Sequence, residues 1–304
     1  MDLKKAYQNF KREFKGQILE NEILARWTAF KIGGPADLFY SADSADNLIK
    51  VVRLAINYKI PYVILGNGTN VLVSDSGFRG LVIKNNCRNF EIKDNLIVSE
   101  GGVLLSSVIL EAVKNNLGGN LWILVNIPGT IGGAIYGNAG SHFEGKLISI
   151  GDFLNKAKLL TKKGEVKEVG KDYFQFDYRE SILKKTKEIV LETILKGRKE
   201  SSEEILKLIM KDKRKRLEDY PSFPFAGSFF KNPKHTSAGK LIDQCGLKGY
   251  RIGEAMVSSK HANYLVNLGK AKASDMIELA KVVRQKVKEK FGVELEEEVQ
   301  YIGL

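Results

Sequence analysis

The feature that most limits what this chain can fold into is a glycine-rich stretch from residue 126 to residue 140. It reads NIPGTIGGAIYGNAG, holds five glycines in fifteen positions and directly follows the short apolar run 121–125. Glycines at this density remove side chains from the backbone, so main-chain N–H groups can approach a polyanionic ligand and positive φ carries no steric cost. The stretch therefore favours a pyrophosphate-binding loop, with a glycine-rich turn in a tightly packed core as the alternative.

Chain length and composition exclude several classes of protein. At 304 residues the chain is long enough for two or three hydrophobic cores. Its apolar runs all fall short of the ~20 residues that span a bilayer, and the first residues lack the apolar segment of a secretory signal. The two cysteines, Cys87 and Cys245, lie far apart without a CxxC pair, which argues against a disulfide framework or a zinc site. We expect a cytoplasmic protein without a metal site or a membrane contact.

The basic charge of the chain suggests anionic partners. The formal net charge is +12, and nucleic acid is the first candidate that such a balance raises. The lysines are scattered, however, and the densest basic run, 211–216, lies in a helical pattern where a solvent-exposed face is the ordinary role. Phosphorylated small molecules would use the same charge, so we expect no nucleic-acid partner.

A second glycine loop, GNGTN at 66–70, follows the apolar strand expected at 61–65. It does not match the dinucleotide-binding fingerprint, because that pattern needs a third glycine that opens a helix, whereas the strand-like run 71–73 follows here. A nest of backbone amides binds phosphate without that fold, so phosphate contact remains the hypothesis. The segment 140–146 imitates a Walker A loop, but Leu147 stands where the magnesium-binding hydroxyl is required.

Hydrophobic periodicity and capping residues predict the order of secondary structure. A polar helix is expected within residues 1–25. Further helices are predicted over 48–56, with Ser44 as cap, and over 106–115, 202–217, 238–245 and 274–291. Strands are predicted over 38–40, 61–65, 71–73, 81–84, 95–99, 156–160, 165–169, 189–195, 261–267 and 293–302.

The last of these strands contains a run of acidic residues. Alternation puts Val293, Leu295, Val299 and Tyr301 on one face and Glu294, Glu296, Glu298 and Gln300 on the other. Glu297 interrupts the apolar face. The pattern alone singles out Glu297, and solubility is the alternative role for any of these acids.

Two other polar residues lie in aromatic or proline-rich surroundings. Arg179 follows the aromatic segment 173–178, where an arginine is either stacked and paired at the edge of a core or an anion clamp. Ser228 follows the proline-bounded loop 220–225 without a GxSxG nucleophile elbow, and with three histidines in the chain a catalytic triad has few candidates. A turn or a cap is the alternative role for this serine.

Six segments together resemble the UDP-N-acetylenolpyruvoylglucosamine reductase family. They are FKIGGPAD at 30–37, GNGTNV at 66–71, IPGTIGGAIYGNAG at 127–140, YRES at 178–181, GSFFKNP at 227–233 and LEEEV at 295–299. They follow one another in order over nearly the whole chain. GTIGG-like loops also occur in the wider vanillyl-alcohol-oxidase-type FAD family, and the combination with GSFFKNP is the specific part. Ala29, where the family usually has threonine, and Ser141-His142 after GNAG depart from the family pattern.

The resemblance implies an α+β fold in three parts. These are an N-terminal helical segment, 1–27, a vanillyl-alcohol-oxidase-type FAD-binding domain, 28–198, and a smaller α+β domain that binds the UDP-sugar, 199–304. The FAD-binding domain would divide into subdomains at about 28–90 and 91–198. One form of the family has an extra tyrosine-bearing loop over the substrate. The segment between Tyr178 and Ser228 is too short for it, so the chain is similar to the form that lacks this loop.

The resemblance also implies an activity and its cofactors. The family reduces UDP-N-acetylglucosamine enolpyruvate to UDP-N-acetylmuramate in bacterial peptidoglycan synthesis, with non-covalent FAD and with NADPH as reductant. We expect a monomer. The two glycine loops would hold FAD through Gly66, Asn67, Gly68, Thr69, Asn70, Pro128, Gly129, Thr130, Gly132, Gly133, Ala134, Gly137, Asn138, Ala139 and Gly140.

By this resemblance, three residues would carry the chemistry. Hydride transfer to C3 of the substrate leaves negative charge at C2 that spreads into the carboxylate as an enediolate. Arg179 would bind that carboxylate with its forked guanidinium, and Glu298, kept protonated by burial, would donate a hydrogen bond to the same oxygens. Ser228 would deliver the proton to C2. The family match, not the alternation, selects Glu298 over Glu297. The substrate contacts that it suggests are Tyr178, Arg216, Lys231, Asn232, Lys240, His261 and Asn263.

Two other functions remain open from sequence. One is an FAD-linked oxidase that uses oxygen, to which GSFFKNP is foreign. The other is a non-catalytic basic protein that binds a nucleotide or RNA. The absorption spectrum of the purified protein separates these classes, since a colourless protein that takes up no FAD favours the binding protein.

Overall fold

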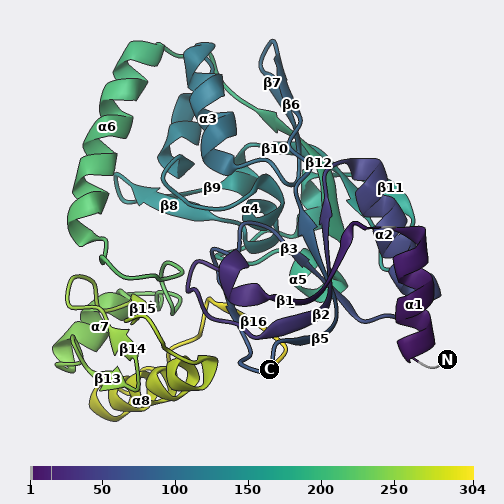
Figure 1. The fold of residues 1–304 in the computed structure, drawn as a ribbon. Helices are drawn as coiled ribbons and strands as arrows, with labels where there is room; N and C mark the ends of the chain where they lie inside the picture. Colours follow the sequence, from purple (N-terminus) through teal and green to yellow (C-terminus); the bar gives the residue numbers. More distant parts are fainter. Residues whose placement is uncertain (1–2, 15) are drawn as a thin grey trace. The chain divides into compact units, whose positions relative to one another are not determined.

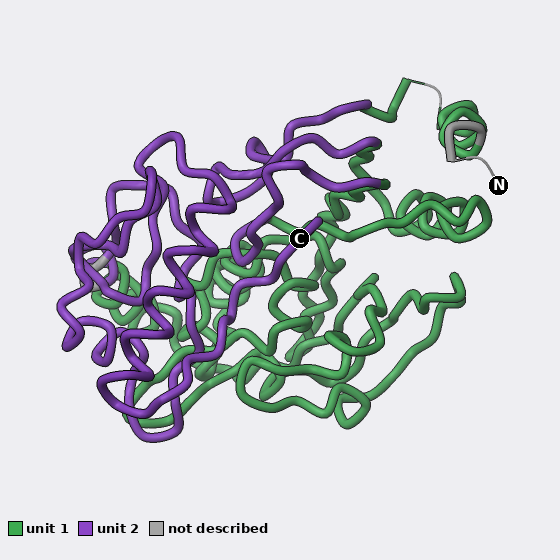
Figure 2. The backbone as a smooth tube through the Cα atoms, turned by 90° about the horizontal axis from the view of Figure 1, so that it is seen from below, with its two compact units in different colours: residues 1–19, 38–67, 80–213 green, residues 20–37, 68–79, 214–304 purple. Residues whose placement is uncertain are grey.

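The computed structural model describes residues 3–14 and 16–304, and the chain divides into two compact units (Figure 2). Unit 1 consists of residues 1–19, 38–67 and 80–213, and unit 2 of residues 20–37, 68–79 and 214–304. The division is therefore not a single cut near residue 199. It falls inside a long helix, and two early segments of the chain belong to the unit that contains the C-terminus.

Hydrogen bonds explain why the two early segments belong to unit 2. Strand β4 (Val71–Val73) pairs in parallel with the last strand, β16 (Gln300–Ile302). The N–H of Gly34 donates to the carbonyl of Ser74 at 2.9 Å, and the N–H of Ser74 donates to the carbonyl of Ile302 at 2.9 Å. Paired backbone groups of this kind satisfy polar atoms that burial would otherwise leave unbonded. Each early segment thus depends on residues far along the chain.

A four-stranded sheet has the order β1-β2-β5-β3, with strands at Ile18–Ile23, Pro35–Ala42, Phe78–Asn85 and Tyr62–Leu65 in that order, and its residues 18–19, 38–42, 62–65 and 80–85 belong to the first part of unit 1. Helices α1 (Leu3–Glu13) and α2 (Ala45–Asn57) lie side by side and share its core (Figure 1). The predicted cap is confirmed, since the hydroxyl of Ser44 accepts a hydrogen bond from the N–H of Asn47. Strand β1 was not predicted.

The second part of unit 1 contains an antiparallel sheet of order β11-β10-β12-β7-β6. Its strands are Val166–Gly170, Leu154–Leu160, Ile189–Lys196, Leu96–Glu100 and Phe90–Lys93, of which β6 was not predicted. The core of this part also takes side chains from α3 (Leu105–Lys114), the 3-10 helix η2 (Gly119–Leu124), α4 (Ile131–Gly137) and α5 (Leu183–Thr186). A hairpin of β8 (Gly140–Phe143) and β9 (Lys146–Ser149) follows α4, and two short 3-10 helices, η3 (Ile150–Asp152) and η4 (Lys171–Phe174), complete the part.

Unit 2 has a core of its own. It contains η1 (Leu24–Trp27), α7 (Ala238–Gln244), the sheet β13-β14-β15 (Arg251–Ile252, Ala255–Val257 and Leu265–Asn267) and α8 (Ala273–Phe291). Gly292 ends α8 with a φ of +68°, a conformation that favours glycine. Helix α6 (Ser202–Asp219) carries the chain from unit 1 into unit 2, and Ile205 and Ile209 on it pack into the unit 1 core. No helix within 3–14 and 16–304 has the length and the apolar composition to cross a membrane.

Two expected strands are shorter than predicted, and the apolar run before the glycine stretch is not a strand. The run 121–125 before the glycine stretch is helical, because it forms the end of η2 and its C-cap, Val125. Of the strand expected at 261–267, the structure forms β15 at 265–267. The N–H of Tyr264 donates to the carbonyl of His261 and closes a turn before it. The strand expected at 293–302 shrinks to β16, preceded by one isolated bridge between Phe230 and Glu297. Local alternation cannot show that these backbone groups bond to distant segments instead of a neighbouring strand.

Candidate active site

The two glycine loops approach each other in unit 1. Gly66 directly follows β3, and a Cβ placed on it would lie 2.8 Å from Oγ1 of Thr130. Thr130 is the N-cap of α4, and its Oγ1 accepts a hydrogen bond from the N–H of Gly133 at 3.3 Å. The chain therefore needs glycine at 66 for a close approach, not for an unusual φ.

The start of α4 is packed against a third glycine pair. The N–H of Gly132 donates to the carbonyl of Gly101 at 2.8 Å, and a Cβ on Gly132 would come 2.9 Å from the same oxygen. Gly129 adopts a φ of +139°, which a side chain would strain. By contrast, a Cβ on Gly137 would meet nothing within 4 Å. The backbone at Gly132 is thus tightly held, whereas the adjacent Gly133 is exposed.

The boundary between the units passes through the first glycine loop, between Asn67 and Gly68. Gly68 has a φ of +64°, and a Cβ there would lie 2.0 Å from the carbonyl oxygen of Trp27, so this position also requires glycine. In unit 2, Nδ2 of Asn70 donates to the carbonyl of Glu298 at 3.1 Å, and the N–H of Gln300 donates to the carbonyl of Asn70 at 3.0 Å. The amide of Asn70 thus holds the backbone of a predicted catalytic residue.

Lys84 is a buried cation beside the first loop. It lies on β5 opposite Leu65 of β3, it is 8% exposed, and its Nζ donates a hydrogen bond to the carbonyl of Gly66. Burial, with a smaller contribution from Arg88, lowers the pKa of Lys84 to about 8. Sequence analysis missed this residue, although a lysine at the end of the apolar run 81–83 was a signal that could have identified it.

Arg179 occupies a tight turn that is attached to the end of α4. The N–H of Asp177 donates to the carbonyl of Glu180 and the N–H of Glu180 donates back to the carbonyl of Asp177, so Tyr178 and Arg179 form the tip. Arg179 has a φ of +57°, which is uncommon for a side chain other than glycine. Its guanidinium lies 5.3 Å from the ring centre of Tyr178, and its Nε and Nη1 atoms are shielded from solvent.

Three further contacts hold this turn in place. Nδ2 of Asn138 donates to the carbonyl of Asp177 at 2.8 Å, while its Oδ1 accepts from the N–H of Gly151. Nζ of Lys184 donates to the carbonyl of Arg179 at 2.6 Å. The hydroxyl of Ser181 donates to the carbonyl of Tyr136 at 2.7 Å. Residues 136–138 and the arginine turn are therefore one rigid piece, and Asn138, with φ +43°, joins them.

In unit 2, the residues that follow Ser228 are held from two sides. Oδ1 of Asn263 accepts from the N–H of Phe230 at 3.0 Å and its Nδ2 donates to the carbonyl of Phe230 at 2.8 Å. The carbonyl of Asn263 also accepts from the N–H of Phe229 at 2.8 Å. On the other side, the N–H of Glu298 donates to the carbonyl of Phe229 at 2.8 Å. Ser228 is half-buried and follows Gly227, which has a φ of +74°.

The neighbouring acids differ in their surroundings. Glu297 accepts hydrogen bonds from the hydroxyl of Tyr301 at 2.7 Å and from Nη1 of Arg284 at 3.4 Å, which gives it a structural role. Burial first, then the bond to Glu297, raises the pKa of Tyr301. Glu296 forms an ion pair with Lys231, whose side chain is 10% exposed. Glu298 is half-buried and is joined to the Ser228 segment through its backbone.

The other predicted substrate residues of unit 2 lie near α7 or on α6. Oδ1 of Asn232 accepts from the N–H of Ala238, the first residue of α7, and Lys240 lies in the same helix. Nδ1 of His261 accepts from the N–H of Asn263 at 3.2 Å, and its ring stacks on Tyr264 at 4.2 Å. Arg216 lies on the part of α6 that belongs to unit 2. Unit 1 thus holds Gly66, Asn67, the residues of 128–140, Tyr178 and Arg179, and unit 2 holds Gly68, Thr69, Asn70, Ser228, Glu298 and the remaining predicted contacts.

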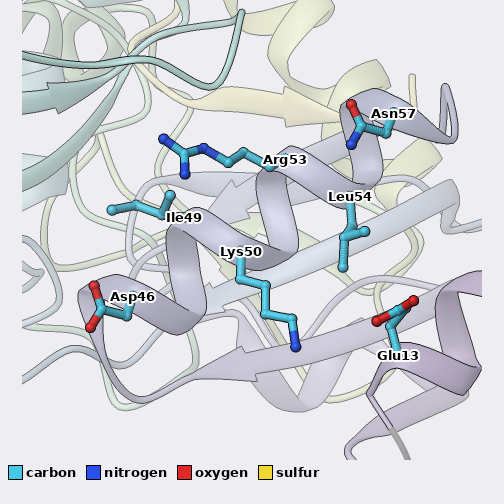
Figure 3. A pocket seen from close by; sticks show the side chains of 7 residues that line it. All are labelled: Glu13, Asp46, Ile49, Lys50, Arg53, Leu54 and Asn57. Carbon is cyan, nitrogen blue, oxygen red and sulfur yellow. The ribbon is translucent and has the colours of Figure 1, made fainter.

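A groove of about 340 Å³ in unit 1 lies away from these residues. It runs along α2, and Glu13 of α1 completes it (Figure 3). Its side chains include both charge signs and do not converge on one point, and Arg53 is engaged by the carbonyl of Gly164 at 2.8 Å. The groove contains no predicted site residue.

Comparison with known proteins assigns each half of the sequence to a family model. A family model described as an FAD binding domain matches residues 36–170, and one described as the C-terminal domain of UDP-N-acetylenolpyruvoylglucosamine reductase matches residues 218–302. The UDP-N-acetylenolpyruvoylglucosamine reductase of Clostridium tetani is 41% identical over 93% of this chain and 91% of its own length. The chain belongs to this reductase family. The protein of the same name from Clostridium botulinum (strain 657 / Type Ba4) is 38% identical over 98% of both chains.

Solved structures agree with the family and extend the fold assignment. The crystal structure of the reductase from Thermus caldophilus matches with a TM-score of 0.79 and 34% identity, over 93% of this chain and 98% of that one. A berberine bridge enzyme variant described as a reticuline dehydrogenase matches with a TM-score of 0.50 and 13% identity, over 65% of this chain and 44% of that one, which shows a shared fold alone. The predicted fold class, an α+β vanillyl-alcohol-oxidase-type FAD-binding region followed by a smaller substrate domain, is confirmed.

Proposed function

We propose that this chain reduces UDP-N-acetylglucosamine enolpyruvate to UDP-N-acetylmuramate for peptidoglycan synthesis, with FAD as cofactor and NADPH as reductant. The observation that carries the proposal is the succession of an FAD-binding model and a reductase C-terminal model along one chain. Relatives with the reductase name are similar over nearly the full length, so the proposal rests on the whole chain and not on one domain. A monomer in the cytoplasm, without nucleic-acid or membrane partners, is part of the proposal.

The glycine loops of unit 1 fit the pyrophosphate of FAD. Their backbone lacks bulk where Gly66 meets Thr130, and at 132 a side chain would displace the carbonyl of Gly101. A backbone without side chains lets a polyanion approach closely, although the N–H groups of Gly132 and Gly133 themselves donate to the carbonyl of Gly101 and to Oγ1 of Thr130. When bound and reduced by NADPH, the flavin would supply the hydride that adds to C3 of the enolpyruvyl group. The residues that we propose to hold it are those of 66–70 and the predicted positions within 128–140.

Arg179 is proposed to bind the substrate carboxylate. A guanidinium presents its N–H groups in a fixed fork that matches the two oxygens of a carboxylate. The turn at 177–180 and its bonds to Asn138 and Ser181 support this role, because they fix the backbone from which the side chain projects. A fixed cation stabilises negative charge in a transition state without first having to reorganise.

Ser228 and Glu298 are proposed to act on the reduced substrate. After hydride addition at C3, the proton of the Ser228 hydroxyl passes to C2, which completes saturation of the double bond. Glu298, in its protonated form, donates a hydrogen bond to the carboxylate oxygens. The bond between the N–H of Glu298 and the carbonyl of Phe229 supports the pair, since it joins the two segments one residue after the serine.

The hydrogen bonds revise the proposed role of two substrate residues. Both polar atoms of the Asn263 side chain are engaged by the backbone of Phe230, and the residue is 2% exposed. Oδ1 of Asn232 is engaged by the first turn of α7. We therefore propose that Asn263 positions the Ser228 segment and that Asn232 positions α7. Direct substrate contact is proposed for Tyr178, Arg216, Lys231, Lys240 and His261.

Steady-state oxidation of NADPH tests the function. The purified protein should show the absorption of bound oxidised flavin, and NADPH should be consumed rapidly only when the enolpyruvyl substrate is present. Rapid consumption that depends on oxygen and not on substrate would identify an oxidase. A colourless protein that takes up no FAD would contradict the proposal altogether.

A further inference from the structure

Lys84 is a buried positive charge without a carboxylate partner among the described residues. It is 8% exposed, and its polar contact is the bond from Nζ to the carbonyl of Gly66. An ammonium group in such a place is costly unless an anion compensates it. The chain supplies no such anion in the part that the structure describes, so the compensation points to a ligand.

The ionisable groups around Lys84 do not supply the missing charge. Arg88, four residues along the chain, is itself a cation and lowers the pKa of Lys84 further. The thiol of Cys87 is neutral, because burial, reinforced by Glu100 and Asp43, raises its pKa to about 12. Tyr62 on the neighbouring strand β3 is also neutral at ordinary pH, since burial raises its pKa.

The bond to Gly66 orients one particular peptide group. The carbonyl of Gly66 and the N–H of Asn67 belong to the same trans peptide, in which they point in opposite directions. Because Nζ of Lys84 holds the carbonyl, the N–H of Asn67 points away from the lysine. Within the described part of the chain, this N–H donates to no other group. A loop with an aligned N–H and a cation behind it is suited to an anion.

We propose that Lys84 positions the Gly66–Asn67 peptide for the pyrophosphate of FAD and supplies the buried positive charge that this anion neutralises. The inference rests on the proposed function, because it takes FAD as the ligand of the loop. Lys84 is a positioning residue here, acting through the peptide and through its charge.

Proton uptake on FAD binding follows from this role. The pKa of Lys84 is about 8 in the protein without ligand, so the residue is largely neutral above that pH. An anion nearby favours the charged form and raises the pKa. Binding at alkaline pH therefore requires a proton from solution. By linkage, the Kd for FAD should be constant below about pH 7.5 and should rise by up to ~10-fold per pH unit above about pH 8.

The test measures FAD binding to the full chain, stripped of flavin, between pH 6.5 and 9.5 by quenching of flavin fluorescence. Calorimetry at pH 8.5 in two buffers of different ionisation enthalpy gives the proton count, which we expect to lie between about half a proton and one proton per FAD. The variant Lys84→Met should bind FAD ~10- to 100-fold more weakly at pH 7 and show no steep rise in Kd. Lys84→Arg should retain tighter binding than Lys84→Met and lose the alkaline rise, since arginine stays charged.

A matched control removes one positive charge elsewhere in unit 1. Lys158 lies on β10, its side chain is 48% exposed, and it pairs with Glu192, so Lys158→Met should keep the wild-type Kd and its pH dependence. Wild-type binding of FAD without proton uptake at pH 8.5 would overturn the inference alone, and so would an unchanged Kd profile in Lys84→Met. Absence of FAD binding by the wild-type chain would overturn the proposed function together with it. The proton count of the wild type decides the matter even if Lys84→Met does not fold.

Discussion

At the scale of single residues, Ser228 is proposed to donate a proton after hydride transfer, so its removal should separate the two half-reactions. Ser228→Ala should leave reduction of the flavin by NADPH intact and slow reoxidation by the enolpyruvyl substrate by ~10²- to 10⁴-fold, the usual contribution of a general acid. Stopped-flow absorbance of each half-reaction measures this. Reoxidation at the wild-type rate, or failure at the NADPH step alone, would move the role of proton donor to another residue, with Glu298 as the first candidate.

Asn263 and Asn267 form a natural pair for testing whether a buried amide matters for catalysis. Nδ2 of Asn267 donates to the carbonyl of Phe30, its Oδ1 accepts from the N–H groups of Gly269 and Ala271, and it is 1% exposed. Each alanine variant leaves buried backbone groups unbonded, at about 1 to 3 kcal/mol per group. We expect both variants to lose stability, and only Asn263→Ala to slow reoxidation by substrate.

The measurement for this pair is urea unfolding alongside the solvent isotope effect on flavin reoxidation. In Asn263→Ala the proton transfer should become slower and the isotope effect larger, because the Ser228 segment loses its anchor at Phe230. Equal kinetic effects in both variants would reduce Asn263 to a structural residue. A double variant with Ser228→Ala should be no slower than Ser228→Ala alone.

Lys84 also predicts an unusual dependence of stability on pH. Its pKa is lowered to about 8 in the folded chain from 10.5, so between these values the unfolded chain binds more protons and stability rises with pH. For the flavin-free protein this contributes about 2 kcal/mol between pH 7.5 and 9.5. Urea unfolding at both pH values should show that the rise in the free energy of unfolding is smaller by this amount in Lys84→Met. A rise of equal size in both proteins would refute the assignment.

Single residues differ in how well sequence identifies them. Family motifs identified Gly66, Gly132 and Arg179, whose surroundings fit the roles proposed for them, because a motif records chemistry at fixed positions. Lys84 was missed, since its importance comes from burial and from the absence of an anion nearby among the described residues. The role proposed for Asn263 was missed as well, because it depends on hydrogen bonds to Phe230 that join positions 33 residues apart.

At the scale of elements, the start of α4 tests how closely the glycine stretch is packed. Gly132→Val places a branched side chain 2.9 Å from the carbonyl of Gly101, which also accepts the N–H of Gly132. The loop must shift, and we expect the purified variant to lose its flavin, as measured by the ratio of absorbance at 450 nm and 280 nm. Gly170→Val is the control, since a Cβ at Gly170 meets nothing within 4 Å. Full flavin occupancy in Gly132→Val would remove 129–133 from the proposed FAD site.

Helices were predicted better than the strands near the C-terminus, and the reason is physical. An amphipathic helix such as α2 or α8 satisfies its backbone internally, so local periodicity is enough to identify it. The expected strand at 293–302 has the right alternation at Leu295 and Val299, which are buried, but Ile302 is buried and Tyr301 is exposed at its end. Its backbone bonds to Phe229, Phe230 and β4, and alternation contains no information about those partners.

At the scale of the whole molecule, the order of segments along the sequence does not show which segments form unit 2. Helix α8 begins at Ala273, and the N–H groups of Ala273 and Ser274 donate to the carboxylate of Asp75 at 2.7 and 3.1 Å. The partner of β16 is β4, also from the segment 68–79. No sequence pattern links positions almost 200 residues apart. Composition and capping suggest that a new domain starts near residue 199, but they do not show that earlier segments complete unit 2.

This composition predicts how a fragment of residues 199–304 behaves. The fragment lacks β4, the cap from Asp75 and residues 20–37, so Phe30 and Ile32 are missing from its core. We expect it to unfold without a cooperative thermal transition and to bind no UDP-sugar. Calorimetry and amide NMR dispersion measure this, with the full chain as reference. In the full chain, Asp75→Ala should lower the stability of unit 2 by about 1 kcal/mol, the usual cost of a lost cap, while flavin is retained. A fragment that melts cooperatively and binds UDP would instead establish 199–304 as an independent domain.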